Sequence, residues 1–179
     1  MRACAAVLVV LFAWGNSGGA VARGDQMTPK VERVIAEIDE AFRGRPWPAK
    51  FALEGTYDEA LIDRDFASLP SLQDSSEIVR HHRNALHALT HEGFRTVLPL
   101  YLRTGLAFPK SEVMDHVAYY VNTASRSDAL RARLAGLNDA QLASLRAALA
   151  TFLSEFAAED KFLSEEIGKA LATMERSSR

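Results

Sequence analysis

Cysteine is nearly absent from this chain, since Cys4 is the only one among 179 residues. It stands ahead of an apolar run, whereas the lipidated cysteine of a lipoprotein follows such a run. The rest of the chain has no thiol, which excludes a disulfide, a zinc-thiolate site and a cysteine nucleophile there. We expect stability to come from packing, because a chain of about 150 residues can bury roughly 70% of its unfolded surface in one core.

An excess of positive charge is also missing. The chain has 21 Lys and Arg residues against 23 Asp and Glu residues, a formal net charge of −2. Binding to nucleic acid through counterion release needs a basic stripe. We therefore expect no nucleic-acid partner, and we interpret the basic run Arg80 to Arg83 as a solvated helix face.

The sequence has little that could anchor it in a membrane. The apolar run 5–14 has about ten residues, whereas a membrane-spanning helix needs ~20. It follows a positive start at Arg2 and precedes the small residues of 15–22, which is the layout of a cleavable signal peptide. We predict a signal peptide over 1–22 and a linker over 23–28, export to the periplasm or the exterior, and no stable membrane anchor after cleavage.

The remaining sequence shows helical periodicity and no convincing strand alternation, which predicts an all-α, single-domain helical bundle over 29–174 with a polar tail at 175–179. Apart from one short helix, the conformation of 49–74 is left open, and the last two helical segments can be read as one. The expected helices cover 29–42, 58–66, 75 or 76 to 89, 90–105, 111–127, 138–156 and 162–174.

Local signals fix several of these helix ends. Thr28 can cap the first helix, Ser111 a later one, and Asn138 with Gln141 has the spacing of a capping box. Pro99 lies inside the helix 90–105 and removes a backbone hydrogen bond, which predicts a bent central helix.

The stretch Ala85-Leu-x-x-Leu-Thr-x-Glu-Gly-Phe-Arg95, followed by Leu98-Pro-Leu-Tyr-Leu102, resembles an uncharacterised bacterial family, number 6714 among the domains of unknown function. Two further segments, Ile38 to Pro46 and Leu137 to Gln141 with Phe152-Leu153, are also similar to it. The resemblance covers about 30–156. It implies a helical domain with a bent central helix and assigns no chemistry.

Four histidines, at positions 81, 82, 87 and 91, suggest a zinc site. On one helical wheel, however, His82 falls in the apolar arc and His87 nearly opposite. The zinc-protease pattern also fails, because the second histidine after His91-Glu92 is replaced by Arg95. We predict no metal and no cofactor, with His82 in the core and His87 at the surface.

Glu112, His116 and Tyr119 follow one another at helical spacing, and an acid, an imidazole and a phenol in a row can do acid-base chemistry. An exposed Glu-His ion pair beside a rim tyrosine explains the same spacing. Carboxylates such as Asp63 and Asp65 are interpreted as solubilising charge. The sequence after the signal peptide has no nucleophile elbow, phosphate-binding loop or dinucleotide fingerprint.

These observations favour a non-enzymatic protein that binds an unknown protein partner or a small ligand. The expected contact surface lies around the central helix, at Pro99, Leu100, Tyr101 and Arg103. The alternative is a hydrolase-type enzyme that uses His116 with Glu112 and Tyr119. A pocket enclosing those three side chains would favour the enzyme.

Overall fold

The computed structural model describes residues 27–44, 47–69, 75–124 and 126–176. Within these ranges the chain is all-α, with eight α-helices and one isolated antiparallel bridge between Ala52 and Leu89. This confirms the predicted all-α class. The predicted signal peptide lies outside the described residues.

The first two helices form where the sequence predicts them. α1 spans Pro29–Ala41, and the Thr28 hydroxyl accepts the backbone N–H of Val31 at 3.3 Å. α2 spans Glu59–Ser68. Between them, the segment 49–53 runs extended beside 88–90: Leu53 N donates to Ala88 O at 2.7 Å, and Thr90 N donates to Phe51 O at 2.6 Å.

The prediction of one helix from 75 or 76 to 89 is wrong for the second half of that range. α3 spans only Ser76–His81, a turn follows, and Ala85–Ala88 form a 3₁₀ helix, η2. Side chains far along the chain donate hydrogen bonds to the carbonyl oxygens that would accept backbone N–H groups in a longer helix. The Tyr101 hydroxyl donates to His82 O, and Arg133 Nη1 donates to Leu86 O at 3.3 Å and His87 O at 3.1 Å.

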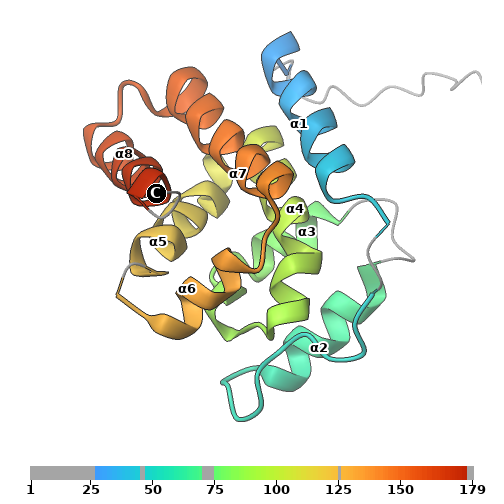
Figure 1. The fold of residues 1–179 in the computed structure, drawn as a ribbon. Coiled ribbons are helices and arrows are strands. Elements are labelled where there is room, and N and C mark those ends of the chain that lie inside the picture. The colour runs from blue at the N-terminus through green and yellow to red at the C-terminus, as the bar shows by residue number, and fades with distance from the viewer. Residues whose placement is uncertain (1–26, 45–46, 70–74, 125, 177–179) are drawn as a thin grey trace, which may run out of the picture.

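α4, His91–Ala107, is the central helix (Figure 1). The Thr90 hydroxyl caps it by accepting Gly93 N–H at 3.0 Å. Pro99 lies inside an otherwise continuous helix. α4 packs against α1, α3, α5, α6 and α7, so most of its side chains are buried.

The start of α5, Val113–Ala124, corrects a predicted cap. The Ser111 hydroxyl donates to Phe108 O instead of capping the helix, and Ser111 ends the short 3₁₀ helix η3, Pro109–Ser111. Glu112, with φ of 60°, turns the chain into α5. The helix also ends at Ala124 instead of near 127.

Three more helices complete the bundle. α6, Asp128–Ala135, has no counterpart among the predicted helices. α7, Asp139–Phe152, begins with the predicted capping box of Asn138 and Gln141 and continues into a π-helical turn, Leu153–Ala157. α8, Lys161–Arg176, is a separate helix, because the chain turns at 158–160.

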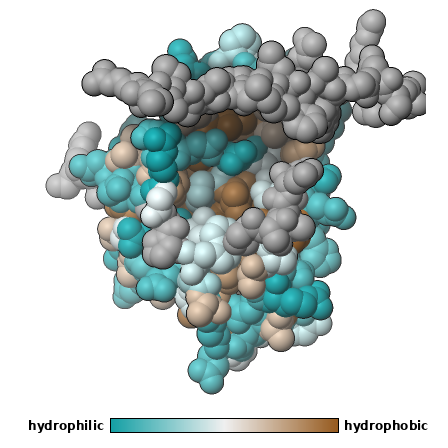
Figure 2. Space-filling view, turned by 90° about the vertical axis from the view of Figure 1, so that its right-hand side faces the viewer, coloured by the Kyte–Doolittle hydropathy of each residue, from teal (hydrophilic) through white to brown (hydrophobic). Residues whose placement is uncertain are grey.

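Two pairs of helices, α1 with α7 and α5 with α8, pack around α4. In Figure 1, α1 lies beside α7, α8 lies beside α5, and α2 lies at the opposite end from α7 and α8. Figure 2 shows one face on which hydrophilic residues cover much of the surface and hydrophobic residues come through near the middle. Within the described ranges, the helices all fall short of the length and apolar character that crossing a membrane requires.

Candidate functional site

A groove follows the seam between α5 and α8 and is the best candidate for a functional site. It consists of two hollows that share Tyr119 and Glu166 as lining residues. We call it the α5–α8 groove. α5 and α8 pack closely along their length, so the groove has fixed walls.

The first hollow, of about 360 Å³, is closed on its third side by the η2 connection. Three helical segments therefore bring together an apolar wall and several titratable groups. The lining residues are Asn84, His87, Asp115, His116, Tyr119, Phe162, Leu163 and Glu166.

His87 is exposed and His116 half-buried, and in both cases partial loss of solvent lowers the pKa of the imidazole, which favours its neutral form. Burial lowers the pKa of His87, and repulsion from the protonated form of His116 and from Arg133 lowers it further. Burial also lowers the pKa of His116, with a smaller effect from Arg83. Beside them, burial raises the pKa of Asp115, and the carboxylate of Glu112 adds to the rise. Perturbed pKa values that gather in a concave site are typical of functional sites.

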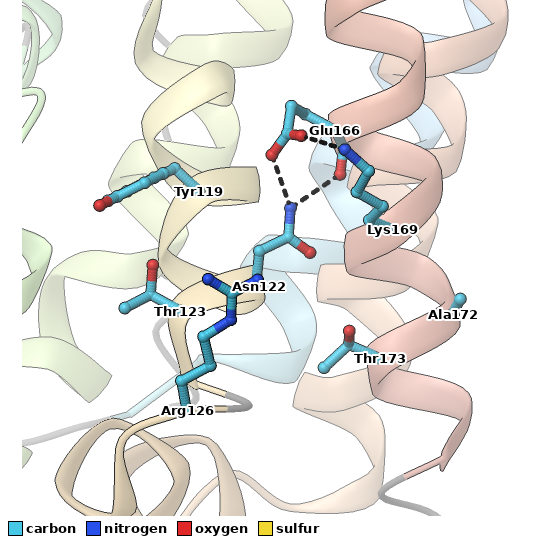
Figure 3. A pocket seen from close by; sticks show the side chains of 8 residues that line it. All are labelled: Tyr119, Asn122, Thr123, Arg126, Glu166, Lys169, Ala172 and Thr173. Atoms are coloured by element: carbon cyan, nitrogen blue, oxygen red, sulfur yellow. Dashed lines mark hydrogen bonds and ion pairs between the residues drawn. The ribbon is translucent and has the colours of Figure 1, made fainter.

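The second hollow, of about 480 Å³, is polar (Figure 3). Asn122 reaches from α5 to α8, where its side-chain N–H donates to Glu166 O at 3.0 Å and to Glu166 Oε2 at 3.1 Å. Lys169 Nζ lies 2.6 Å from Glu166 Oε1, and the guanidinium of Arg126 points toward Asn122. Thr123, Ala172 and Thr173 complete the lining.

The structure separates the predicted trio. His116 and Tyr119 both line the first hollow. Glu112 is exposed and forms an ion pair with Arg83 at 3.2 Å. The groove therefore combines His116 with His87 and Asp115, two residues that the trio did not include.

The predicted contact surface on the central helix is only partly accessible. Tyr101 is completely buried, and Pro99 is buried in the same helix. Leu100 is half-buried, and Arg103 is exposed and lies 3.2 Å from Asp39 Oδ1. In this conformation Pro99 and Tyr101 cannot contact a partner, because α1, α5 and α7 cover their helix.

The histidines lie in three different environments. His82 is buried as predicted, and its Nε2 lies 2.9 Å from Asp65 Oδ2. His81, His82 and Asp65 each offer one potential ligand atom, and these atoms lie within 4.8 Å of one another. His87 lines the groove, and the exposed His91 lies beside Gly136.

The interpretation of Asp63 and Asp65 as solubilising charge is wrong. Asp63 Oδ1 accepts the backbone N–H groups of Phe51 and Ala52, both at 2.7 Å, and so fixes the extended segment. Asp65, on α2, binds His82 at the end of α3. Neither partner is at helical spacing from its aspartate, so the sequence pattern gave no signal for these bonds.

No protein-family model, curated protein or solved structure matches the chain. The resemblance to family 6714 therefore stays a prediction. The groove has to be interpreted from its own chemistry.

Proposed function

We propose that this chain is an exported, non-enzymatic binding protein that holds a small organic acid in the α5–α8 groove. One observation carries the proposal. A hollow lined by apolar side chains and neutral imidazoles lies directly beside a hollow that contains two cationic side chains.

The first hollow suits the hydrophobic part of such a ligand. Phe162 and Tyr119 are exposed by 78% and 58%, and Leu163, on α8, is partly buried against the core. Small-molecule sites are concave, mainly apolar, and carry a few polar groups that fix orientation. His87 and His116 can supply those polar groups, because a neutral imidazole both donates and accepts hydrogen bonds.

The second hollow suits an anionic end. Arg126 and Lys169 carry two positive charges, and Glu166 carries one negative charge, so these three groups sum to +1. The Lys169 hydrogen bond lowers the pKa of Glu166, which keeps this carboxylate ionised. A ligand carboxylate would therefore pair best with Arg126, whose planar guanidinium can bind a carboxylate through two hydrogen bonds.

Titration calorimetry with aromatic and aliphatic carboxylates, each compared with its uncharged amide, tests the proposal. We expect at least one carboxylate to bind about tenfold more tightly than its amide, which corresponds to about 1.4 kcal/mol. Arg126→Gln should abolish that preference. Arg33→Gln, which removes an exposed arginine from α1, should leave it intact.

Binding that does not distinguish carboxylate from amide would contradict the charge argument. Binding that survives Arg126→Gln unchanged would place the ligand elsewhere. Export is tested separately by the N-terminal sequence of protein from the exported fraction, which should begin at Arg23.

The enzyme alternative has one observation in its favour, the neutral pair His87 and His116 in a single hollow. A neutral imidazole can act as a general base. Such a hydrolase would lose its turnover in His116→Ala and also in His87→Ala. Turnover that is lost in both His116→Ala and His87→Ala would show that the protein is an enzyme. Binding of a carboxylate without turnover supports the binding function.

A further inference from the structure

We propose that Asp65, His81 and His82 form a binding site for a divalent transition-metal ion, with Zn²⁺ as its representative. The site lies outside the α5–α8 groove, where the end of α2 meets the end of α3. The sequence predicts no metal, because one helical wheel separates the histidines and gives no signal for Asp65, 17 positions from His82.

The ligand atoms are spaced closely enough to share one ion. They lie within 4.8 Å of one another, and His82 Nε2 lies 2.9 Å from Asp65 Oδ2. With metal-ligand bonds of ~2.1 Å, two ligands of a tetrahedral zinc ion are about 3.4 Å apart. A small opening of the Asp65–His82 contact and a turn of the His81 ring would satisfy this geometry.

Two of the three ligands are already held in position. The His82 ring packs against the buried Phe66 ring, with centroids 5.4 Å apart, and His82 O accepts the Tyr101 hydroxyl. Asp65 Oδ1 accepts from Arg64 Nε at 2.9 Å, so Oδ2, which faces His82 Nε2, is the oxygen that would bind the ion. Such outer contacts orient metal ligands and raise their affinity.

His81 is the adjustable ligand and opens the site to water. Its ring is exposed and stands edge-on to His82, with centroids 4.8 Å apart. Three protein ligands with the fourth position open to solvent are typical of zinc sites that are not purely structural. Two imidazoles and one carboxylate suit Zn²⁺, Co²⁺ or Fe²⁺, whereas Mg²⁺ and Ca²⁺ prefer oxygen ligands.

The neighbouring arginines do not close the site. Arg80 lies over the Phe108 ring, 5.0 Å from its centroid, and Arg83 pairs with Glu112 at 3.2 Å. Both guanidinium groups are therefore engaged by partners outside the three ligands. Arg64 stays beside Asp65, and its charge lowers the affinity for any cation.

Zn²⁺ titration calorimetry of the full, tag-free protein is the test, together with the visible absorption of the Co²⁺-loaded form. His81→Ala removes an exposed ligand and should not impair folding. Asp65→Asn keeps a group that can hydrogen-bond to His82 and removes the carboxylate. His87→Ala removes another histidine, close in sequence but outside the cluster, and serves as the matched control.

We expect one Zn²⁺ per chain, affinity at least about tenfold weaker in His81→Ala and in Asp65→Asn, and no change in His87→Ala. The Co²⁺ absorption should weaken in the same two variants. An absence of binding, or binding that either ligand variant leaves unchanged, would overturn the site. Loss in His87→Ala alone would place the metal in the groove. Arg126→Gln, which tests the groove, should leave Zn²⁺ binding unchanged, so the two proposals fail separately.

Discussion

Two helix contacts in this molecule differ sharply in the room that they leave. At the start of α4, a Cβ added to Gly93 would lie 2.6 Å from Phe51 O and 2.9 Å from Phe51 Cα. In α8, the described residues leave nothing within 4 Å of a Cβ added to Gly168. The first contact brings two backbones together, whereas α8 leaves open space at Gly168, a position that does not line the groove.

The close contact depends on hydrogen bonds that distant residues make with the same extended segment. Thr90 N donates to Phe51 O, and Asp63 accepts from the backbone N–H groups of Phe51 and Ala52. Along the α5–α8 groove, where side chains form the walls, Asn122 makes a bond of this kind to Glu166 O. The close contact at Gly93 maintains the fold, and the proposed binding function uses the side-chain-lined seam between α5 and α8.

The largest effect should come from Gly93→Ala. The new methyl group would meet a backbone carbonyl that cannot turn aside, so we expect a loss of about 3 kcal/mol in the free energy of unfolding. Urea-induced unfolding followed by circular dichroism measures it. A stability equal to that of the unmodified chain would show that this contact is not tight.

Asp63→Ala should cost about 2 kcal/mol, because two backbone N–H groups lose an acceptor with a negative charge. The same unfolding measurement applies. Asp63→Asn keeps one oxygen acceptor, so its stability should fall between that of the unmodified chain and that of Asp63→Ala. If the alanine variant is as stable as the asparagine variant, Asp63 does not fix the extended segment.

Tyr101→Phe removes only the hydroxyl that binds His82 O, and we expect a loss of about 1.5 kcal/mol. The ring stays to fill the core, so the dependence of unfolding on urea should keep its slope. A variant with unchanged stability would mean that the turn after α3 is held by other contacts.

In the open region, Gly168→Ala should stabilise the protein by up to about 1 kcal/mol, because alanine favours the helix and meets no neighbour among the described residues. It is also the matched control for Gly93→Ala. A destabilised Gly168→Ala variant would contradict the free space that the comparison assigns to α8.

The smallest effect should come from Asp115→Asn at the groove. Burial raises the pKa of Asp115 in the folded protein, so its ionised carboxylate costs stability at neutral pH. The cost disappears as the pH falls through the raised pKa toward the ordinary value of 3.8. We expect a gain below about 1 kcal/mol at pH 7 that shrinks on acidification. A gain independent of pH would have another cause.

The sequence predicts those parts of the fold whose signals are local. Thr28 and the pair Asn138 and Gln141 lie within three residues of the N–H groups that they bind. The break after His81 was missed, because it depends on partners far along the chain: Asp65, Tyr101 and Arg133.

Of the candidate site, the sequence predicted only residues of the α5 wall. Helical spacing placed His116 and Tyr119 together on α5, and both line the groove. Which surface faces them depends on how α8 packs against α5 and on the turn that brings His87 to the same hollow. Spacing within one helix carries no information about either, so His87, Asp115 and Glu166 were not predicted.

The central claim is that the α5–α8 groove binds a small organic acid, and NMR chemical-shift mapping tests it most directly. A carboxylate ligand should shift the side-chain amide signals of Asn122 and the backbone amides of Thr123 and Leu163, and its uncharged amide analogue should shift them much less. Shifts confined to α1, α4 or α7, or none with any carboxylate, would contradict the account.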